Sequence, residues 1–543
     1  MFAFHRGRKI LGVSLSILLI NMAAIMERAD ENLLPAVYKE VSQAFNAGPS
    51  DLGYLTFIRN FVQGLSSPLA GILVINHARP TVLAMGTLCW ALSTAAVGAS
   101  QHFSQAAFWR AVNGFGLAIV IPALQSFIAD SYKDGVRGTG FGLLSFIGNL
   151  GGIGGGVLAT VMAGQQYWGV QGWRFAFIMM ASLSLLIGLL VFLFVVDPRK
   201  TIGVNRDTSE NFESVVIEPS FNFLSSFCCR DELVEKGNSL SIWTESWTAT
   251  KAVMKVKTFQ IIVLQGIVGS LPWTAMVFFT MWFELIGKHI PILFHSKLYF
   301  HLKYIEIADD MLPLHHSSKL SRHDEIHLLA VSYCLITVPW SQLSGFNHNK
   351  TAALLSFFAV GCSLGSLLGG IIADRMSHLY PHSGRIMCAQ FSAFMGIPFS
   401  WFLLRVIPQS VSSYFTFAVT LFMMGLTISW NGTAVNAPMF AEVVPVKHRT
   451  MIYAYDRAFE GSFSSFAAPL VGILSEQMFG YDSKSVDPVK GSVREASALS
   501  KGLLSMMAVP FGLCCLFYTP LYRYFRQDRE NARTAGSKAL EIM

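Results

Sequence analysis

Long apolar segments recur along this chain, and they constrain its fold more than any other feature. A segment of about 20 apolar residues is long enough to cross a bilayer as a helix. Because 52% of the residues are hydrophobic and 13% are charged, the composition is typical of a polytopic membrane protein and not of a soluble globule. We predict an all-α membrane protein with twelve spanning helices, at approximate positions 11–37, 52–75, 80–100, 106–129, 139–163, 174–196, 259–287, 351–373, 386–407, 413–438, 452–478 and 500–521.

Basic residues predict the orientation of these helices. Arg79, Arg137, Arg385 and Arg449 fall on the same predicted side as the N-terminus, and the positive-inside rule makes that side cytoplasmic. We therefore expect both termini in the cytoplasm. The net charge of +7 includes no basic tract with interleaved aromatic residues, so no nucleic-acid partner is expected. The sequence favours neither the plasma membrane nor an endomembrane.

The predicted helices form two groups of six. We expect an N-terminal six-helix bundle at 1–196, a cytoplasmic central loop at 197–257, a C-terminal six-helix bundle at 258–521 and a cytoplasmic tail at 522–543. Residues 288–345 are an atypical, histidine-containing insert in a short outside loop. Two explanations stay open, a genuine insert or a translated retained intron, because Gly-Lys and Ser-Gly at its ends can be encoded by splice-site sequences.

The first apolar segment carries charged residues. Glu27 and Glu31 are four residues apart, and Arg28 lies three before Glu31, so acid and base can share one helix face. Ionisable groups at membrane depth are costly, and they usually mark a substrate or proton pathway. The alternative is that Met26–Pro35 lies at the helix mouth among the lipid headgroups.

The two halves of the sequence repeat a signature. Ala129-Asp130 is followed by Arg137 seven residues after the acid, and Ala441-Glu442 is followed by Arg449 at the same spacing. Two copies of one motif are expected of a transporter that is built from two six-helix repeats.

Two further motifs complete a resemblance to a known family. Arg110 opens an R-x-x-x-G-x-G pattern through Gly116, and residues 370–375 read G-I-I-A-D-R. Together with the repeat, they resemble the major facilitator superfamily. The resemblance implies two six-helix bundles that rock about a central cavity, and secondary active transport. One departure is Ile75, which stands at the acidic position of the first-half motif, so polar contacts on that side are expected to be asymmetric.

A narrower resemblance concerns the first helix. Met26-Glu27-Arg28 resembles the acid–arginine pair of spinster-like transporters, a branch linked to lysolipids and sphingoid lipids. Asn21, Arg110, Asp130 and Arg137 fall where that branch has similar residues, and the chain most resembles its plant-type members. We therefore consider a small organic or amphipathic solute, lysolipid-like solutes among them.

Candidate coupling residues follow from helix depth. Counted at about 1.5 Å per residue, Glu27 and Arg110 lie at similar depth in two antiparallel helices, so they can meet. We hypothesise that Glu27, with Arg28 and Glu31 beside it, exchanges a proton while Arg110 supplies the competing positive charge. A static buried ion pair is the alternative. Secondary candidates within predicted helices are Arg59, Asp456, Arg457 and Glu460.

Two sets of residues are predicted to act between the bundles. The proposed cytoplasmic gating residues come from the motifs of the two halves and are Asp130, Arg137, Asp374, Arg375, Glu442 and Arg449. For the basic residues among them, the alternative is that their charges only fix the orientation of the loops. Glycines at every fourth position give two predicted helices a smooth face for close packing between the bundles. These glycines are Gly148, Gly152, Gly156, Gly361, Gly365 and Gly369.

These observations predict a proton-coupled secondary transporter that acts by alternating access. The alternative is a transporter-derived receptor or scaffold without net transport, which the altered Gly71–Ile75 motif and the insert would favour. No nucleophile–base pair or metal-ligand cluster shares a helix face, so an enzyme, a cofactor and a metal are not expected. The expected partners are the lipid bilayer, protons and the solute, and the protein is expected to be a monomer.

Overall fold

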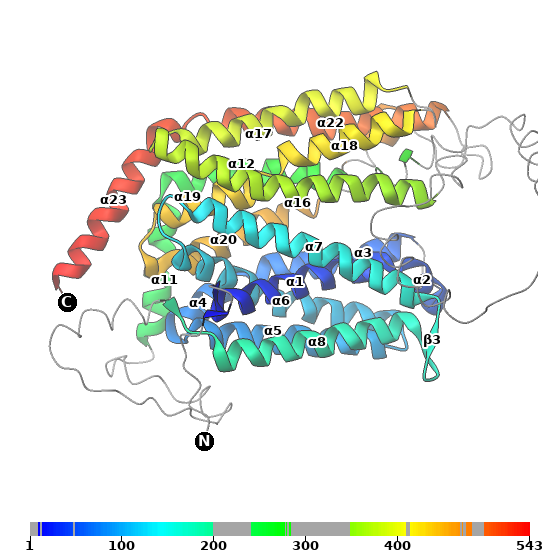
Figure 1. Ribbon diagram of the computed structural model, residues 1–543, viewed down its shortest axis with the longest axis horizontal. Coiled ribbons are helices and arrows are strands. Elements are labelled where there is room, and N and C mark those ends of the chain that lie inside the picture. Colours follow the sequence, from blue (N-terminus) through cyan, green and yellow to red (C-terminus); the bar gives the residue numbers. More distant parts are fainter. Residues whose placement is uncertain are drawn as a thin grey trace, which may run out of the picture.

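The computed structural model shows long helices that run roughly parallel to the longest axis of the molecule (Figure 1). It describes residues 9–10, 13–46, 49–198, 240–276, 279, 282–283, 348–408, 413–466, 470, 474–480 and 493–542. The predicted insert at 288–345 and most of the predicted central loop, residues 199–239, lie outside the described residues.

Each of the six predicted segments in the first half forms helix. The predicted span 52–75 is divided between α3 and α4, with a bend of 41° where Pro68 begins the second helix. Two-residue strands form one hairpin before α1 and another before α8. The elements are β1 Lys9–Ile10, β2 Val13–Ser14, α1 Leu15–Ala36, α2 Tyr38–Phe45, α3 Pro49–Ser66, α4 Pro68–Asn76, α5 Arg79–Ala99, α6 Phe103–Ser131, α7 Arg137–Ala163, β3 Gln166–Tyr167, β4 Val170–Gln171 and α8 Gly172–Phe194.

The second half follows the same pattern, with more irregular turns. Its segments include π-helical turns (η3, η5 and η7) and a 3-10 turn (η6). The elements are α11 Leu240–Lys255, α12 Lys257–Ala275, α16 His348–Leu379, α17 Gly384–Trp401, η3 Phe402–Val406, α18 Tyr414–Ile428, η5 Asn431–Asn436, α19 Ala437–Glu442, η6 Val446–His448, α20 Arg449–Ser464, η7 Leu474–Met478, α22 Val493–Phe517 and α23 Leu521–Ile542.

Membrane-spanning character agrees with the sequence prediction for most segments. Among the described residues, seven helices are long and apolar enough to cross a membrane, and α3–α4 and α11–α12 are two bent pairs that pass the same test together. Three predicted spans fall outside these sets because α1 carries four charged residues and because α18 and α20 have only 15 and 16 residues. The charged residues of α1 and α20 lie within predicted membrane-spanning segments, where charges are rare. These two helices are therefore the first places to look for a functional site.

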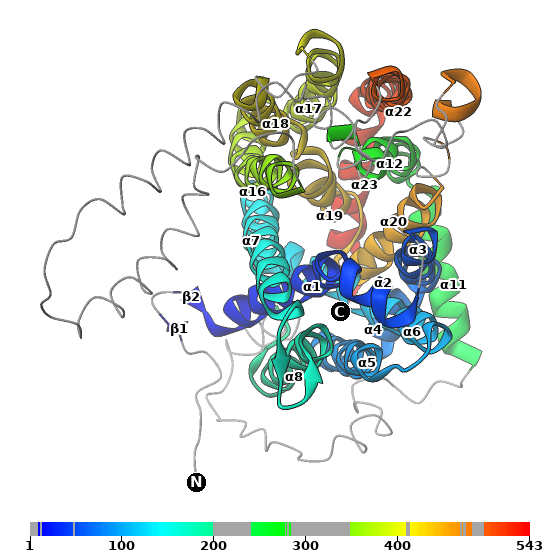
Figure 2. The ribbon, with the colours of Figure 1, turned by 90° about the vertical axis from the view of Figure 1, so that its right-hand side faces the viewer.

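The helices form two groups, which we call the N-terminal half (α1–α8) and the C-terminal half (α12–α22). Figure 2 shows the two groups from one end. They meet along two seams: α7 packs against α16, and α20 packs against α3, α4 and α6. Helix α23 then crosses the end of the bundle at which α1 begins (Figure 1). We call this the arginine-rich end, because Arg79, Arg137, Arg385 and Arg449 lie there.

Among the described residues, the two halves share an apolar core at the arginine-rich end. One buried cluster contains Phe127 and Phe141 from the N-terminal half together with Phe440 and Tyr453 from the C-terminal half. The rings of Phe141 and Tyr453 lie 5.9 Å apart, centroid to centroid. Toward the opposite end, the described residues form two separate clusters, one within each half. The structure is therefore closed at the arginine-rich end.

Candidate functional site

Helix α1 brings three charged side chains to one face. Arg28 contacts both neighbouring acids: its Nε lies 3.5 Å from Glu27 Oε2, and its Nη1 donates a hydrogen bond of 2.7 Å to Glu31 Oε2. Helical spacing accounts for this arrangement, because residues three and four apart lie on the same face. Glu27 is 9% exposed. Glu27 is therefore buried in the helix bundle, whereas the side chains of Arg28 and Glu31 are 40% and 34% exposed.

Glycines on α7 make room for this charged face. A Cβ at Gly148 would lie 3.2 Å from Arg28 Cγ, and a Cβ at Gly152 would lie 2.5 Å from Asn32 Nδ2. Side chains at these positions would displace α1 or its polar residues. This finding corrects the prediction for the first glycine series, which packs inside the N-terminal half and not between the halves.

A second set of charged residues faces α1 from α3 and α20. Arg59 of α3 and Arg457 of α20 both lie within electrostatic range of Glu27 and Glu31. Helices α3 and α20 pack closely, since a Cβ at Gly64 would lie 2.9 Å from the backbone nitrogen of Ser462. Charges from the two halves thus meet in one cluster.

The two acids of α20 turn toward the C-terminal half. Glu460 Oε1 lies against Gly266 of α12, so close that a Cβ added at Gly266 would overlap the Glu460 carboxylate. Asp456 lies one helical turn before Glu460 and interacts with it electrostatically. Helix α20 therefore presents Arg457 toward the N-terminal half and an acidic pair toward its own half.

Arg59 also belongs to a buried network that the sequence did not predict. Its Nε donates to Asn113 Oδ1 at 3.0 Å, and its Nη2 lies 3.9 Å from Asp30 Oδ2. Asp30 accepts further hydrogen bonds from Thr94 Oγ1 at 2.8 Å and from Asn113 Nδ2 at 3.3 Å. Asp30 is completely buried. Asp30 therefore lies inside the N-terminal half, because its partners come from α3, α5 and α6.

The expected pairing of Glu27 with Arg110 is not present. Arg110 is buried, but no ion pair joins it to Glu27 within the described part of the chain. Equal depth in two helices does not fix which faces oppose one another. Arg59, on α3, approaches the acids of α1 in place of Arg110.

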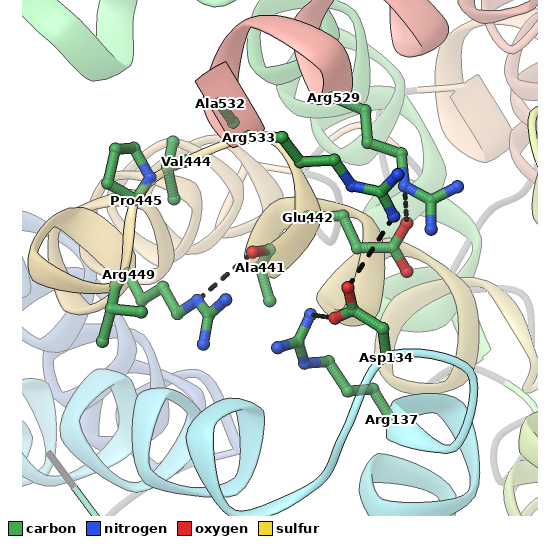
Figure 3. Close-up of a pocket in the computed structure, with 11 residues that line it drawn as sticks. Asp134, Arg137, Ala441, Glu442, Val444, Pro445, Arg449, Arg529, Ala532 and Arg533 are labelled. Carbon is green, nitrogen blue, oxygen red and sulfur yellow. Dashed lines mark hydrogen bonds and ion pairs between the residues drawn. The ribbon is translucent and has the colours of Figure 1, made fainter. Parts of the chain in front are cut away.

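The arginine-rich end contains a network that repeats in both halves. Arg137 donates from Nε to the carbonyl oxygen of Ala129 at 2.8 Å, and Arg449 donates in the same way to Ala441 at 3.2 Å. Both contacts span eight residues, so the sequence repeat is also a repeat of geometry. Arg137 also pairs with Asp134 (Figure 3).

Asp130 joins the halves at this end. Its carboxylate contacts Arg449 of α20, and its Oδ2 lies 2.5 Å from Arg79 Nη1 at the start of α5. A hydrogen bond of 2.8 Å between Thr450 Oγ1 and Ser126 Oγ lies beside this ion pair. Arg79, a basic residue that was expected only to orient the helices, is therefore part of the network.

Asp374 makes the corresponding contact from the C-terminal half. Its carboxylate accepts hydrogen bonds from the backbone nitrogens of Gly138 at 2.9 Å and Thr139 at 2.6 Å, at the beginning of α7. Arg385 donates to the same carboxylate at 2.8 Å and also pairs with Glu442 at 3.3 Å. The neighbouring Arg375 is exposed and joins no ion pair among the described residues.

Ile75 makes this end asymmetric. It stands at the position that corresponds to Asp374, and its apolar side chain packs against the shared core. Ile75 cannot accept hydrogen bonds from the beginning of α20 as Asp374 does from α7. The close contact on this side is apolar: a Cβ at Gly71 would lie 2.5 Å from Met451 Sδ.

The second glycine series also packs within one half. A Cβ at Gly369 would overlap the Trp430 ring, and Gly361 and Gly365 face the backbone of α18. The predicted seam between α7 and α16 exists, but other residues form it. A Cβ at Gly142 would lie 2.5 Å from the Ser366 carbonyl oxygen, and Gly370 contacts Gly138.

Comparison with known sequences gives one family match. The sequence model of the Major Facilitator Superfamily matches residues 20–307. Multidrug resistance protein 2 of Bacillus subtilis (strain 168) is 32% identical over 81 residues, which make up 15% of this chain and 20% of that protein. The chain therefore spans about one fifth of the length of this curated relative.

Solved structures give matches over nearly the whole chain. A bacterial homolog of the human lysosomal transporter Spinster, in an inward-facing and unoccupied conformation, aligns with a TM-score of 0.54 and 14% identity, and covers 95% of this chain and 98% of its own. FucP in the outward conformation aligns with a TM-score of 0.55 and 12% identity, over 93% and 98% of the two chains. The proton:xylose symporter XylE gives 0.54 and 12%, over 92% and 94%. At these identities the similarity shows the fold alone.

Proposed function

The chain belongs to the major facilitator superfamily, whose members are secondary transporters and not enzymes, and from this premise we propose that it couples the movement of an amphipathic organic solute to protons. The proposal includes alternating access between two bundles, residues 1–196 and 258–521, joined by a cytoplasmic loop at 197–257 and followed by a cytoplasmic tail at 522–543. The bilayer, protons and the solute are the proposed partners, and the proposed unit is a monomer.

The observation that supports coupling is the charged cluster between the halves. Glu27 and Glu31 belong to α1, whereas Arg457 belongs to α20 in the other half. Rocking of the halves moves Arg457 relative to the two acids, and the distance to a positive charge affects whether a carboxylate holds a proton. Conformation and protonation would then depend on one another, as coupled transport requires.

Arg59 supplies this cluster with a positive charge that does not move relative to α1. It is held by Asn113 and Asp30 inside the N-terminal half, so it stays beside α1 when the halves move. Glu27 therefore has one arginine that is fixed and one that is carried by the other half. We propose Glu27 as the residue that exchanges the proton, with Glu31 and Arg28 as its immediate partners.

We propose that the arginine-rich end is the cytoplasmic gate. Basic residues gather there, as the positive-inside rule expects of the cytoplasmic side. Asp130 with Arg449, and Asp374 with the start of α7, are the contacts between halves that must break for this gate to open. Arg137 and Glu442 support these contacts within their own halves.

The solute class is proposed from the sequence resemblance of residues 26–28 to spinster-like transporters. An amphipathic solute with a charged headgroup also suits a site that contains both acids and arginines. Lysolipids and sphingoid bases are accordingly the first solutes to test, and small organic ions are the second.

Flux into proteoliposomes tests the function. We expect uptake of a solute from this panel, an increase when a pH gradient is imposed, and loss of that increase in Glu27→Gln. The matched control is Glu530→Gln on α23, because the same substitution is made there at an exposed carboxylate. Uptake by Glu27→Gln that responds to the gradient like the native protein would remove Glu27 from the mechanism. Saturable binding without flux would instead favour a receptor or scaffold.

A further inference from the structure

A cavity of about 200 Å³ lies at the arginine-rich end (Figure 3). Three separate parts of the chain line it. Asp134 and Arg137 come from the N-terminal half, Glu442 and Arg449 come from the C-terminal half, and α23 covers it with Arg529 and Arg533. The volume is several times the roughly 30 Å³ that one water molecule occupies in the liquid. The cavity can therefore hold a small polyatomic group.

The lining is positively charged overall, with four arginines and two acids. Each acid already contacts two arginines. Asp134 pairs with Arg137 and lies 3.9 Å from Arg533, while Glu442 lies 3.0 Å from Arg529 and 3.3 Å from Arg385. The acids thus neutralise only part of the charge that surrounds the cavity.

Arg137 and Arg449 present equivalent donors from opposite halves. In both residues, Nε donates to a backbone carbonyl oxygen and Nη1 contacts an aspartate. Within the described part of the chain, the Nη2 group of neither residue donates a hydrogen bond to protein. Figure 3 shows both guanidinium groups directed toward the space between them. Two forks of N–H donors are therefore available to one ligand.

The two guanidinium groups also repel one another. Arg449 lies within electrostatic range of Arg137, and both are at least nine-tenths buried. An anion between them would offset this repulsion and accept hydrogen bonds from both. Guanidinium groups match the oxygens of a phosphate better than those of a monovalent halide, because the planar fork donates two parallel bonds.

We propose that this cavity binds the phosphate group of an anionic ligand, held between Arg137 and Arg449, with Arg533 of α23 completing the site. Because the two central arginines come from opposite halves, the ligand binds only when the arginine-rich end is closed. The ligand therefore has a higher affinity for the closed conformation than for the open one, and its binding shifts the equilibrium toward the closed conformation by that difference. The phosphate can be a free anion or the headgroup of a lipid, since both carry the same recognised chemistry.

The full-length protein in lipid nanodiscs distinguishes these two sources. In one arm, discs of phosphatidylcholine are titrated with inorganic phosphate at constant ionic strength, with chloride as the reference salt, and heat of binding and melting temperature are measured. In the other arm, phosphatidic acid replaces part of the phosphatidylcholine. A saturable effect of inorganic phosphate supports a site for free anions. A rise in melting temperature with phosphatidic acid, without an effect of inorganic phosphate, supports a lipid headgroup.

Matched variants identify the site. Arg533→Gln and Arg137→Lys are expected to weaken the effect by about tenfold, because each loses charge-assisted hydrogen bonds to the anion. Arg526→Gln is the control, since Arg526 lies on the same helix, is similarly exposed and does not line the cavity. Arg533 is exposed, so its substitution is expected to leave the melting temperature without phosphate unchanged. The proposal is overturned if neither phosphate source acts, or if Arg526→Gln weakens the effect as much as Arg533→Gln.

Discussion

At the scale of single residues, the charged side chains of α1 have two different environments. Glu27 and Glu31 contact Arg28 and face the other half, whereas Asp30 is enclosed within its own half by Thr94, Asn113 and Arg59. Helical spacing from the sequence correctly grouped Glu27, Arg28 and Glu31. The partners of Asp30 could not be predicted in this way, because they come from three other helices.

The Asp30 network is expected to be structural. Asp30→Ala removes the carboxylate that forms an ion pair with the buried Arg59, and breaking a buried ion pair in this way costs about 3 to 5 kcal/mol. Thr94→Val is the comparison, because it removes two hydrogen bonds, one donated to Asp30 and one accepted from Asn113, and should cost about 2 kcal/mol. Denaturant unfolding of both variants in detergent measures the two losses. Equal, small losses would contradict the importance assigned to the buried charge.

His448, in the turn η6 before α20, gives a prediction about pH. Burial and the neighbouring Lys447 lower the pKa of His448 from its ordinary value to about 4. Between pH 6.5 and pH 4, the unfolded chain therefore takes up a proton that the folded protein does not, so stability falls as pH decreases through this range. In His448→Gln, the melting temperature should fall less over the same range. Parallel pH curves for the two proteins would show that His448 is not responsible.

At the scale of elements, apolar length predicted helix positions well. The predicted spans 80–100 and 174–196 agree closely with α5 (Arg79–Ala99) and α8 (Gly172–Phe194). The breaks were missed: 413–438 contains α18, the π-helical η5 and the start of α19. Hydropathy measures the length of an apolar segment, but it contains no information about a local change in hydrogen-bond pattern. The predicted central loop at 197–257 contains a helix that apolar length did not predict, α11 (Leu240–Lys255).

Glycine spacing predicted close packing but not the partner helix. A series of every fourth residue defines one face of a helix, and any neighbour can occupy that face. Helix α7 uses one glycine face for α1 and another for α16, and only contacts between residues distant in sequence distinguish the two.

Two glycines of α7 provide a matched test of the seam. Gly142→Ala places a Cβ 2.5 Å from the Ser366 carbonyl oxygen of α16, so the two halves must separate slightly and the melting temperature should fall. Gly154→Ala meets no atom within 4 Å, so it should gain up to about 1 kcal/mol of helix propensity and raise the melting temperature. Thermal unfolding in detergent compares them. Shifts of the same sign would indicate that Gly142 is not at a tight seam.

At the scale of the whole molecule, the closed end is held in two different ways. The contact of α7 with α16 includes Asp374, which accepts backbone hydrogen bonds across the seam, whereas the contact of α20 with α4 is apolar around Gly71 and Ile75. The repeat in the sequence indicated both positions, and the departure at Ile75 indicated that they would differ. The geometry adds that the Asp130–Arg449 ion pair lies on the same seam as the apolar contact.

This difference predicts that the seam between α7 and α16 depends on a polar contact, the one made by Asp374, more than the seam between α20 and α4 does. Asp374→Asn weakens three hydrogen bonds to Gly138 and Thr139 and removes the charge opposite Arg385, and bonds to charged groups contribute about 1.5 to 3 kcal/mol each. A loss of this size is enough to move a two-state equilibrium toward the form that is open at the arginine-rich end. Spin labels at Lys133 and Lys447, which are exposed and lie in different halves, should then report a longer distance in a larger fraction of molecules.

The control for this prediction is Asp528→Asn. Asp528 of α23 accepts a hydrogen bond of 2.7 Å from the backbone nitrogen of Thr258 at the start of α12, so it also caps a helix, but that contact does not cross between the two halves. Loss of this cap should lower the melting temperature, because it also removes a carboxylate that accepts a backbone hydrogen bond at a helix start. It should leave the distance between the labels unchanged. If both variants lengthened the distance equally, general loosening would explain the result. A longer distance in Asp374→Asn alone identifies the contact with α7 as one that holds the two halves together.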